Sequence, residues 1–354
     1  MKDFSSMTKS ELTDFILKKK KELGERVRIV GYKGQFDDLL EFSDIIGDAY
    51  ELVDAVKNTK AEFLVFTGWR FFSDIACIFA PDKKVIQANI KNDCPLAEII
   101  DENDIKKVYT LLKERCTEKE VIPIGYVAAH YKIRSYCGEN NGTTCTPANA
   151  LKVIEHYLKE NKSIFFIPAN DAFNIITALN LPEDEIFVIK KDTDLDTIPA
   201  NKKIYAWNVE CYVHTHYKVD DIKKLKDQNK DIKIIGHKEC APEILEQCDY
   251  TGFVGDIYQI LKEAPSGSSW GVGTVDTWVK RAAYEYSDKN IVSFRTDLVC
   301  LDMKITDYQD IAESLQSIED YINGEGELKT QIDISEEYRE NAGKALTRMF
   351  EICK

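Results

Sequence analysis

The sequence lacks a long apolar run. No stretch approaches the roughly 18 uninterrupted apolar residues that a membrane-spanning helix needs. The N-terminal stretch MKDFSSMTKSELTDFILKKKK mixes acidic residues with lysines and has no apolar core of the secretory-signal type. We therefore expect a cytoplasmic protein that does not cross a membrane.

Positive charge is also scarce. The chain carries 47 Lys and Arg against 61 Asp and Glu, which gives a formal net charge of −14. Such a field repels nucleic acids and anionic membranes, so we expect neither as a partner. The 354 residues are too many for one ordinary domain, and the 44% apolar content is enough for two or three separate cores.

No CxxC pair occurs among the ten cysteines. This absence disfavours a zinc ribbon or a thioredoxin-type redox site. A cytoplasmic chain keeps its thiols reduced, so a disulfide framework is not expected either. Most of the cysteines are then small buried apolar residues, and Cys77 and Cys353 fit that interpretation.

Short apolar runs alternate with amphipathic stretches along most of the chain. The alternation predicts β/α units and parallel sheets, with helical patterns at 39–58 and 220–229 between runs. The predicted strands are VRIVGY (27–32), EFLVFTG (62–68), KKVIQA (83–88), VIPIGYV (121–127), SIFFIP (163–168), KKIYAW (202–207), DIKIIGH (231–237) and KNIVSF (289–294).

We predict an α/β fold of three small three-layer α/β/α domains, similar to one another in fold only. The predicted parts are an N-terminal helical extension (1–26), domain 1 (27–115), domain 2 (116–225), domain 3 (226–330) and a C-terminal helix (331–354).

Three cysteines, Cys94, Cys211 and Cys300, each follow a predicted strand, one in each domain. Ligands of open α/β sheets bind beyond the carboxyl ends of the strands, so three thiolates could meet there. Three sulfur ligands suit a [4Fe-4S] cluster with one iron left open, which can bind a substrate oxygen as a Lewis acid. Scattered ligands have no diagnostic spacing, so the pattern alone leaves coincidence open.

The order of short motifs adds to this pattern. These motifs are FSDIIGDAYEL (42–52), LVFTGWRFFSDIACIFAPDKKV (64–85), CPLAEII (94–100), GYV (125–127), CTPANA (145–150), CYVH (211–214), GHKECAPEI (236–244), DYTG (249–252), VGT (272–274) and CLDMK (300–304). In this order, from about Val27 to Leu315, the chain resembles the quinolinate synthase family, an iron–sulfur family of NAD biosynthesis.

The resemblance implies three pseudo-symmetric domains around a central oxygen-sensitive [4Fe-4S] cluster, with Cys94, Cys211 and Cys300 as the three ligands and one iron open. Iron–sulfur assembly machinery is then an implied partner. The family condenses iminoaspartate with dihydroxyacetone phosphate and releases water and phosphate, so it implies a transferase or lyase acting on a small anionic substrate.

Four residues match positions with catalytic or binding roles in that family. His237 and Glu239 match its His-Pro-Glu-Cys motif, where Glu exchanges protons near the open iron and His acts as an acid or base near neutral pH. His214 could orient the substrate or the cluster loop, and Tyr126 matches a tyrosine that contacts substrate.

Several departures fall where the family holds its substrate. The strand end reads VGYKGQ, so the expected His becomes Tyr32 or Gly31 and the second Tyr becomes Gly34, while Arg70 replaces another His. At five more positions this chain has a residue without a polar side chain where the family has a polar one: Ala49, Ala128, Pro147, Val254 and Val275. Each donor lost from a charged substrate costs roughly 1–3 kcal/mol.

Other residues of the predicted pocket could bind an anion. Tyr32 and the new cations Lys33 and Arg70 could grip it differently from the family. Thr146 and Asn149 remain at a predicted helix start, and Thr274 stands near another, in a stretch (265–277) that resembles a glycine-rich loop. The acidic stretch 182–203 has little family counterpart; it is a surface excursion, a pocket edge or a subunit contact.

The sequence favours a quinolinate-synthase-like iron–sulfur enzyme that performs a dehydration, condensation or ring closure on a different small anionic metabolite. Four alternatives stay open: sulfur transfer from the open iron, radical cleavage of S-adenosylmethionine, authentic quinolinate synthesis, and a non-catalytic cluster-binding sensor. The oligomeric state is not predicted.

Overall fold

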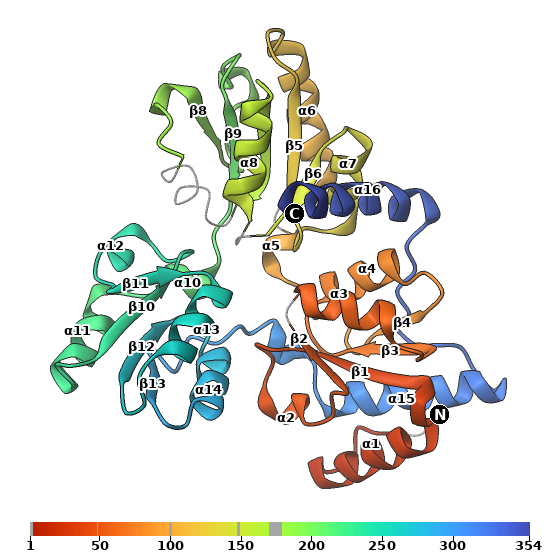
Figure 1. Cartoon of the computed structure of the whole chain (residues 1–354). Coiled ribbons are helices and arrows are strands. Elements are labelled where there is room, and N and C mark those ends of the chain that lie inside the picture. The colour runs from red at the N-terminus through yellow and green to blue at the C-terminus, as the bar shows by residue number, and fades with distance from the viewer. Residues whose placement is uncertain (1–2, 48, 99–100, 147–148, 170–178) are drawn as a thin grey trace. The chain divides into compact units, whose positions relative to one another are not determined.

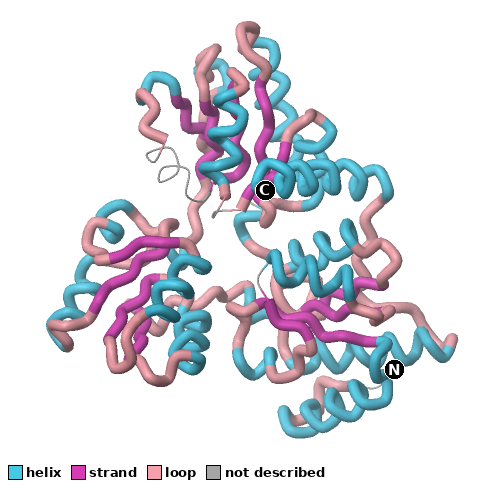
Figure 2. The backbone as a smooth tube through the Cα atoms, in the orientation of Figure 1, coloured by secondary structure: helices cyan, strands magenta, loops and turns pink. Residues whose placement is uncertain are grey.

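A computed structural model describes residues 3–47, 49–98, 101–146, 149–169 and 179–354. Three sheets carry the fold, and every pairing between their named strands is parallel (Figures 1 and 2). Helices flank each sheet, which confirms the predicted α/β class with parallel sheets. No helix in these ranges is both long and apolar enough to cross a membrane.

The first and third sheets have four strands and the second has five. The first, in spatial order, is β2 (Ile45–Gly47), β1 (Val27–Tyr32), β3 (Phe63–Phe66) and β4 (Lys84–Gln87). The second is β6 (Thr143–Cys145), β5 (Val121–Tyr126), β7 (Ser163–Ala169), β9 (Ile204–Asn208) and β8 (Ile186–Ile189). The third is β11 (Tyr250–Gly252), β10 (Lys233–His237), β12 (Ser269–Gly273) and β13 (Asn290–Ser293).

The chain divides into two compact units. Met1–Cys94 and Cys300–Arg339 form the first, and Pro95–Val299 with Glu340–Lys354 form the second, which holds two of the sheets. The first sheet lies within 27–115, the second within 116–225 and the third within 226–330. The five-part division by residue number stays a prediction.

The helices of the first unit cover both faces of its sheet (Figure 1). They are α1 (Lys9–Leu23), α2 (Asp37–Leu40), α3 (Ala49–Asn58), α4 (Arg70–Phe79) and α15 (Tyr308–Asn323). On one face, buried side chains of α1 and α15 pack with Ile29 and Val65 of the sheet. Lys19 of α1 and Glu319 of α15 form an ion pair at 2.7 Å that joins these helices.

The second unit is built from more helices. They are α5 (Pro95–Glu98), α6 (Glu102–Arg115), α7 (Tyr131–Glu139), α8 (Ala150–Lys159), α10 (Tyr212–Thr215), α11 (Val219–Gln228), α12 (Pro242–Leu245), α13 (Val254–Glu263), α14 (Asp276–Glu285) and most of α16 (Glu336–Cys353). Short 3-10 turns lie at Gly24–Arg26, Glu183–Glu185, Leu195–Thr197 and Met303–Ile305. The expected helices at the N-terminus, at 220–229 and in the tail are confirmed as α1, α11 and α16.

The three sheets repeat one register. In each sheet, the first strand in sequence (β1, β5 or β10) ends opposite the last residue of the strand at its edge (β2, β6 or β11). The backbone N–H of the residue after the first strand donates to the carbonyl of that last residue at 2.8–3.0 Å. The terminal pairs are Tyr32 with Gly47, Tyr126 with Cys145, and His237 with Gly252. Tyr32, Tyr126 and His237 therefore occupy equivalent strand ends.

A second feature is shared by the first and third sheets. The carboxylate of Asp44 accepts the N–H of Ile29 at 2.8 Å, and the carboxylate of Asp249 accepts the N–H of Ile234 at 2.8 Å. Both aspartates close a connection that contains one short helix. The first and third sheets thus fold alike at this connection, where no sequence repeat was visible.

Two local expectations are corrected, and one stretch of open role gains a strand. The helical pattern at 39–58 is interrupted by β2, a three-residue strand too short to show a period in sequence. The stretch 265–277 is not a glycine-rich loop, because its residues Ser269–Gly273 form β12. Within 182–203, β8 pairs with β9 and adds a fifth strand to the second sheet.

Candidate functional site

The three candidate cluster cysteines follow equivalent strands. Cys94 comes after β4, Cys211 after β9 and Cys300 after β13, each the fourth strand of the order that the sheets share. Cys94 directly precedes α5, Cys211 is the N-cap of α10, and Cys300 is buried. All ten cysteines lie in the described ranges, and none forms a disulfide there. Soft thiol donors at repeated positions fit an iron–sulfur cluster.

Titratable side chains gather beside the third sheet. His237 is the last residue of β10, Glu239 lies two residues on, and His214 projects from α10. The Glu239 carboxylate lies 2.8 Å from His214 Nδ1 and 3.8 Å from His237 Nδ1. A sulfur of Cys211, a ring nitrogen of His214 and a carboxylate oxygen of Glu239 lie within 4.8 Å of one another.

His237 is held as a neutral imidazole. Burial, and next the charge of His214, lower the pKa of His237 to about 3. The backbone N–H of Glu239 donates to Nδ1 at 3.3 Å, which leaves the ring proton on Nε2. The ring stacks on His214 with 4.3 Å between centroids, and Phe253 meets it edge-on. His237 is therefore suited to donate a hydrogen bond rather than to titrate near neutral pH as the sequence suggested.

His214 has the opposite electrostatics. Burial disfavours its imidazolium, but the negative charges of Cys211 and Glu239 outweigh burial and raise the pKa of His214 to about 10. Its Nε2 lies 3.2 Å from the hydroxyl of Thr274, a buried residue between β12 and α14. The Tyr217 hydroxyl donates to the carbonyl of Thr274 and fixes this turn. Of the two stacked histidines, His214 carries the positive charge, and its ring is the one nearer to Glu239.

The equivalent place in the first sheet is aromatic. The Tyr32 ring packs against both Trp69 and Phe72, with ring centroids 5.2 and 5.1 Å away. A Cβ on Gly34 would stand 2.6 Å from a ring carbon of Tyr32, closer than real side chains come. The Tyr32 ring therefore fills the space where a side chain at position 34 would begin.

The two predicted cations already have acidic neighbours. Lys33 pairs with Glu51 at 2.7 Å, in a half-exposed contact. Arg70, at the start of α4, lies 3.7 Å from the buried carboxylate of Asp74. Exposed pairs of this kind contribute little to stability, so Lys33 can exchange its partner at small cost.

The candidate residues of the second sheet lie at two strand ends. Tyr126 ends β5, is buried, and packs 6.0 Å from Phe166 between ring centroids. The side chain of Asn149 accepts the backbone N–H of Thr146 at 2.7 Å, which occupies one of the donors expected to bind an anion. Pro147, expected to open this helix, lies outside the described residues.

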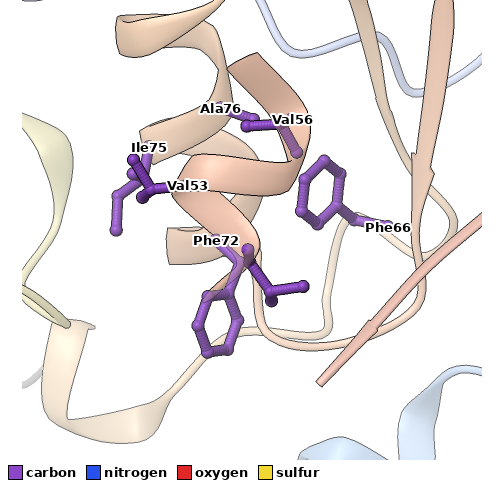
Figure 3. Close-up of a pocket in the computed structure, with 7 residues that line it drawn as sticks. Val53, Val56, Phe66, Phe72, Ile75 and Ala76 are labelled. Carbon is purple, nitrogen blue, oxygen red and sulfur yellow. The ribbon is translucent and has the colours of Figure 1, made fainter. Parts of the chain in front are cut away.

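Figure 3 shows a small pocket between α3 and α4. Its lining is wholly apolar and shares Phe72 with the aromatic group around Tyr32. The lining residues are Leu52, Val53, Val56, Phe66, Phe72, Ile75 and Ala76. Such a lining offers no acid, base or ligand, so this pocket belongs to the core of the first unit.

Sequence reasoning missed the aromatic residues that shape both places. Trp69 and Phe72 surround Tyr32, and Phe253 packs on His237. The run WRFF at 69–72 was a signal for the first group, because three large aromatic rings at a strand-to-helix turn rarely all face the core.

Fold and site together define an α/β protein with three parallel sheets and potential metal ligands at the strand ends. The family model described as quinolinate synthetase A protein matches residues 14–351, and the chain belongs to that family. A quinolinate synthase of Geobacillus kaustophilus is 30% identical over 363 residues, covering 99% of this chain and 96% of the relative. A quinolinate synthase of a Geobacillus species (strain WCH70) is 29% identical over 357 residues, covering 99% of this chain and 96% of the relative. The quinolinate synthase of Bacillus subtilis is 28% identical over 360 residues, covering 99% of this chain and 95% of the relative.

Proposed function

We propose that this protein is an iron–sulfur enzyme of the quinolinate synthase type that acts on a small anionic metabolite other than the family's own substrates. The main support is the contact of His237 and Glu239 with His214, together with the Tyr32 ring that occupies the space of a side chain at position 34. In this proposal the acid–base group of the family is kept, and its substrate-binding group has changed.

Cys94, Cys211 and Cys300 are the proposed ligands of a [4Fe-4S] cluster. Their support is the shared position after the fourth strand of each sheet, and the thiol chemistry of the donors. When bound, such a cluster supplies an open iron that polarises a substrate oxygen.

The neighbouring side chains have separate roles in this proposal. Glu239 is the group that exchanges protons with the substrate, because its carboxylate is only about 10% exposed and close to two imidazoles. His237 donates from Nε2 to a substrate oxygen, and its low pKa keeps it neutral throughout the working pH range. His214 offsets the negative charge of Glu239 and Cys211.

The remaining candidates bind the rest of the substrate. Lys33 is the proposed counter-charge for an anionic group, since its contact with Glu51 is exposed and easily exchanged. Tyr126 offers a phenol at the second strand end, and Tyr32 presents an aromatic face at the first. Arg70, Thr146 and Asn149 stay as candidates whose donors are partly engaged within the fold.

Authentic quinolinate synthesis is the second candidate function. The observation in its favour is the similarity to curated quinolinate synthases over 99% of this chain. Anaerobic turnover of the reconstituted protein with iminoaspartate and dihydroxyacetone phosphate, with quinolinate measured by mass spectrometry, separates the two. We expect little quinolinate from this protein beside a Bacillus subtilis quinolinate synthase as the positive control.

The substrate can be sought directly. A desalted extract of small metabolites is incubated anaerobically with reconstituted protein and with its Glu239→Gln variant, and consumed and formed anions are compared by mass spectrometry. We expect at least one anion to be consumed, and another formed, by the unaltered protein but not by Glu239→Gln. His216→Gln is the matched control, since His216 is exposed and close to the same site. In the quinolinate assay described above, a yield equal to that of the Bacillus subtilis enzyme would refute the altered-substrate proposal.

Iron and sulfide content tests the ligand assignment separately. We expect Cys94→Ala, Cys211→Ala and Cys300→Ala each to lose most of the cluster after anaerobic reconstitution. Cys248→Ala, which changes a half-buried cysteine outside the proposed ligand set, should keep it. Full cluster content in any of the first three variants would remove that cysteine from the ligand set.

A further inference from the structure

We propose that Cys211, His214 and Glu239 form a mononuclear site for a divalent metal of the zinc class in protein that carries no iron–sulfur cluster. One donor atom from each side chain lies within 4.8 Å of the others, and all three residues belong to the second unit. The inference rests on these side chains and not on the proposed reaction.

The donor set suits such an ion. Zinc binds thiolate, imidazole and carboxylate at about 2.0–2.3 Å, so donors around one ion stand roughly 3.3–3.8 Å apart. His214 Nδ1 and Glu239 Oε2 are 2.8 Å apart and must separate by less than about 1 Å to admit the ion. The widest pair of the three donor atoms, at up to 4.8 Å, must close by about 1 Å. One thiolate and one carboxylate also balance the two positive charges of the metal.

His214 is oriented for ligation. Its Nδ1 is buried and faces the Glu239 carboxylate at 2.8 Å. On the other side of the ring, Nε2 meets the Thr274 hydroxyl at 3.2 Å. A metal at Nδ1 displaces the proton that the imidazolium carries there, and the proton on Nε2 stays with Thr274. This kind of outer partner fixes the tautomer of zinc-binding histidines.

Rotation of the His214 side chain is also restricted. His237 stacks on it with an interplanar angle of 8°, and His237 is itself held by the N–H of Glu239. The His214 and Glu239 side chains are each about 10% exposed, so the site is sheltered from water. Three protein ligands leave a fourth position for water or another small ligand, as in catalytic rather than structural zinc sites.

The site shares Cys211 with the proposed cluster, so the two occupants exclude each other. A zinc ion on this thiolate therefore blocks cluster assembly until it is removed. We expect cluster reconstitution to slow severalfold when one equivalent of Zn²⁺ is added first, and to recover after chelation.

Titration of cluster-free, full-length protein with Co²⁺ under argon tests the proposal. We expect one tetrahedral site, with the charge-transfer absorption of a single thiolate, and displacement of Co²⁺ by Zn²⁺. Cys211→Ser should abolish the charge-transfer band. His214→Gln and Glu239→Gln should weaken Co²⁺ binding by at least about 10-fold, and Thr274→Val by about 10-fold through the lost outer partner.

Three controls make the outcome decisive. Cys94→Ser, Cys300→Ser and His216→Gln should bind Co²⁺ within about twofold of the unaltered protein, and circular dichroism checks that every variant is folded. A band with the intensity of three thiolates, lost equally in Cys94→Ser and Cys300→Ser, would assign the metal to the three cysteines instead. Absence of stoichiometric binding would also overturn the proposal.

Discussion

The same backbone position carries different chemistry in each sheet. Tyr32, Tyr126 and His237 end equivalent strands, but only His237 is followed two residues later by a carboxylate, that of Glu239. The corresponding residue in the first sheet is Gly34, over which the Tyr32 ring lies. The acid–base chemistry of the fold is thus concentrated in one repeat, and the first repeat contributes an aromatic surface.

Gly34→Ala tests how firmly Tyr32 is held. The new methyl group would lie 2.6 Å from the Tyr32 ring, which Trp69 and Phe72 keep in place. We expect a loss of roughly 1–3 kcal/mol in the free energy of unfolding, measured in urea. In a Tyr32→Ala background the same substitution should cost less than about 0.5 kcal/mol. Equal losses in both backgrounds would show that the ring is not the obstacle.

Asp310, in the first turn of α15, gives a pH dependence. Burial raises the pKa of Asp310 from 3.8 to about 6, against the hydrogen bond from Asn89. A carboxyl whose pKa is raised by folding stabilises the protein below pH 4, and this stability is lost as pH rises to about 6. Two pKa units correspond to about 3 kcal/mol, which partial exposure reduces to roughly 1–2 kcal/mol.

Urea unfolding between pH 4 and pH 7 measures this effect. Asp310→Asn keeps an oxygen for the N–H groups of Asp307 and Asn89, which both donate to one carboxylate oxygen. We expect the variant to lose less stability than the unaltered protein over that pH range. Parallel curves for the two proteins would contradict the raised pKa.

At the scale of elements, the C-terminal helix depends on one glycine of α7. A Cβ on Gly138 would stand 1.8 Å from the carbonyl oxygen of Asn341 in α16. Nearby, the Thr143 hydroxyl donates to the carbonyl of Ala345 at 3.0 Å, and Arg348 donates to the carbonyl of Gly142. α16 therefore lies against backbone, and no side chain can yield to a larger residue.

Gly138→Ala should displace α16 from α7 and lower the free energy of unfolding, measured by thermal unfolding, by at least about 2 kcal/mol. Hydrogen exchange in 340–353 should rise in the same variant. Gly255→Ala is the control, because its Cβ in α13 meets nothing within 4 Å. That change should stabilise the protein by up to about 1 kcal/mol. Unchanged exchange in 340–353 of Gly138→Ala would mean that α16 adapts.

The sequence predicted elements with a strong apolar signal and missed the weak ones. The eight predicted strands form, whereas β2, β6 and β11, of three residues each, are too short for an alternation to be seen. The longer β8 and β12 were missed as well, because their stretches were interpreted as an acidic excursion and a glycine-rich loop. His237 and Glu239 were found because they are neighbours in one motif. The contact of Tyr32 with Trp69 joins two segments far apart in sequence, and no local pattern predicts it.

At the scale of the whole molecule, the proposed cluster would take ligands from both units. Cys94 and Cys300 belong to the first unit and Cys211 to the second, and each unit has its own core. We expect cluster-free protein to unfold in two calorimetric transitions and cluster-loaded protein in one, because binding free energy couples both units to the same ion group.

Reconstituted Cys211→Ala should keep two transitions in the same anaerobic calorimetry. A single transition in the cluster-free protein would instead indicate that the two units unfold together without any metal.

The discontinuity of the first unit has a consequence for protein synthesis. Its sheet is complete by Gln87, but α15, which covers one face together with α1, begins at Tyr308. A ribosome adding about 5–20 residues per second needs roughly 10–40 s more to make that helix. During this interval apolar side chains of the nascent sheet stay uncovered while the middle of the chain can already fold. A chaperone that shields this face would act on the N-terminal segment until α15 has been made.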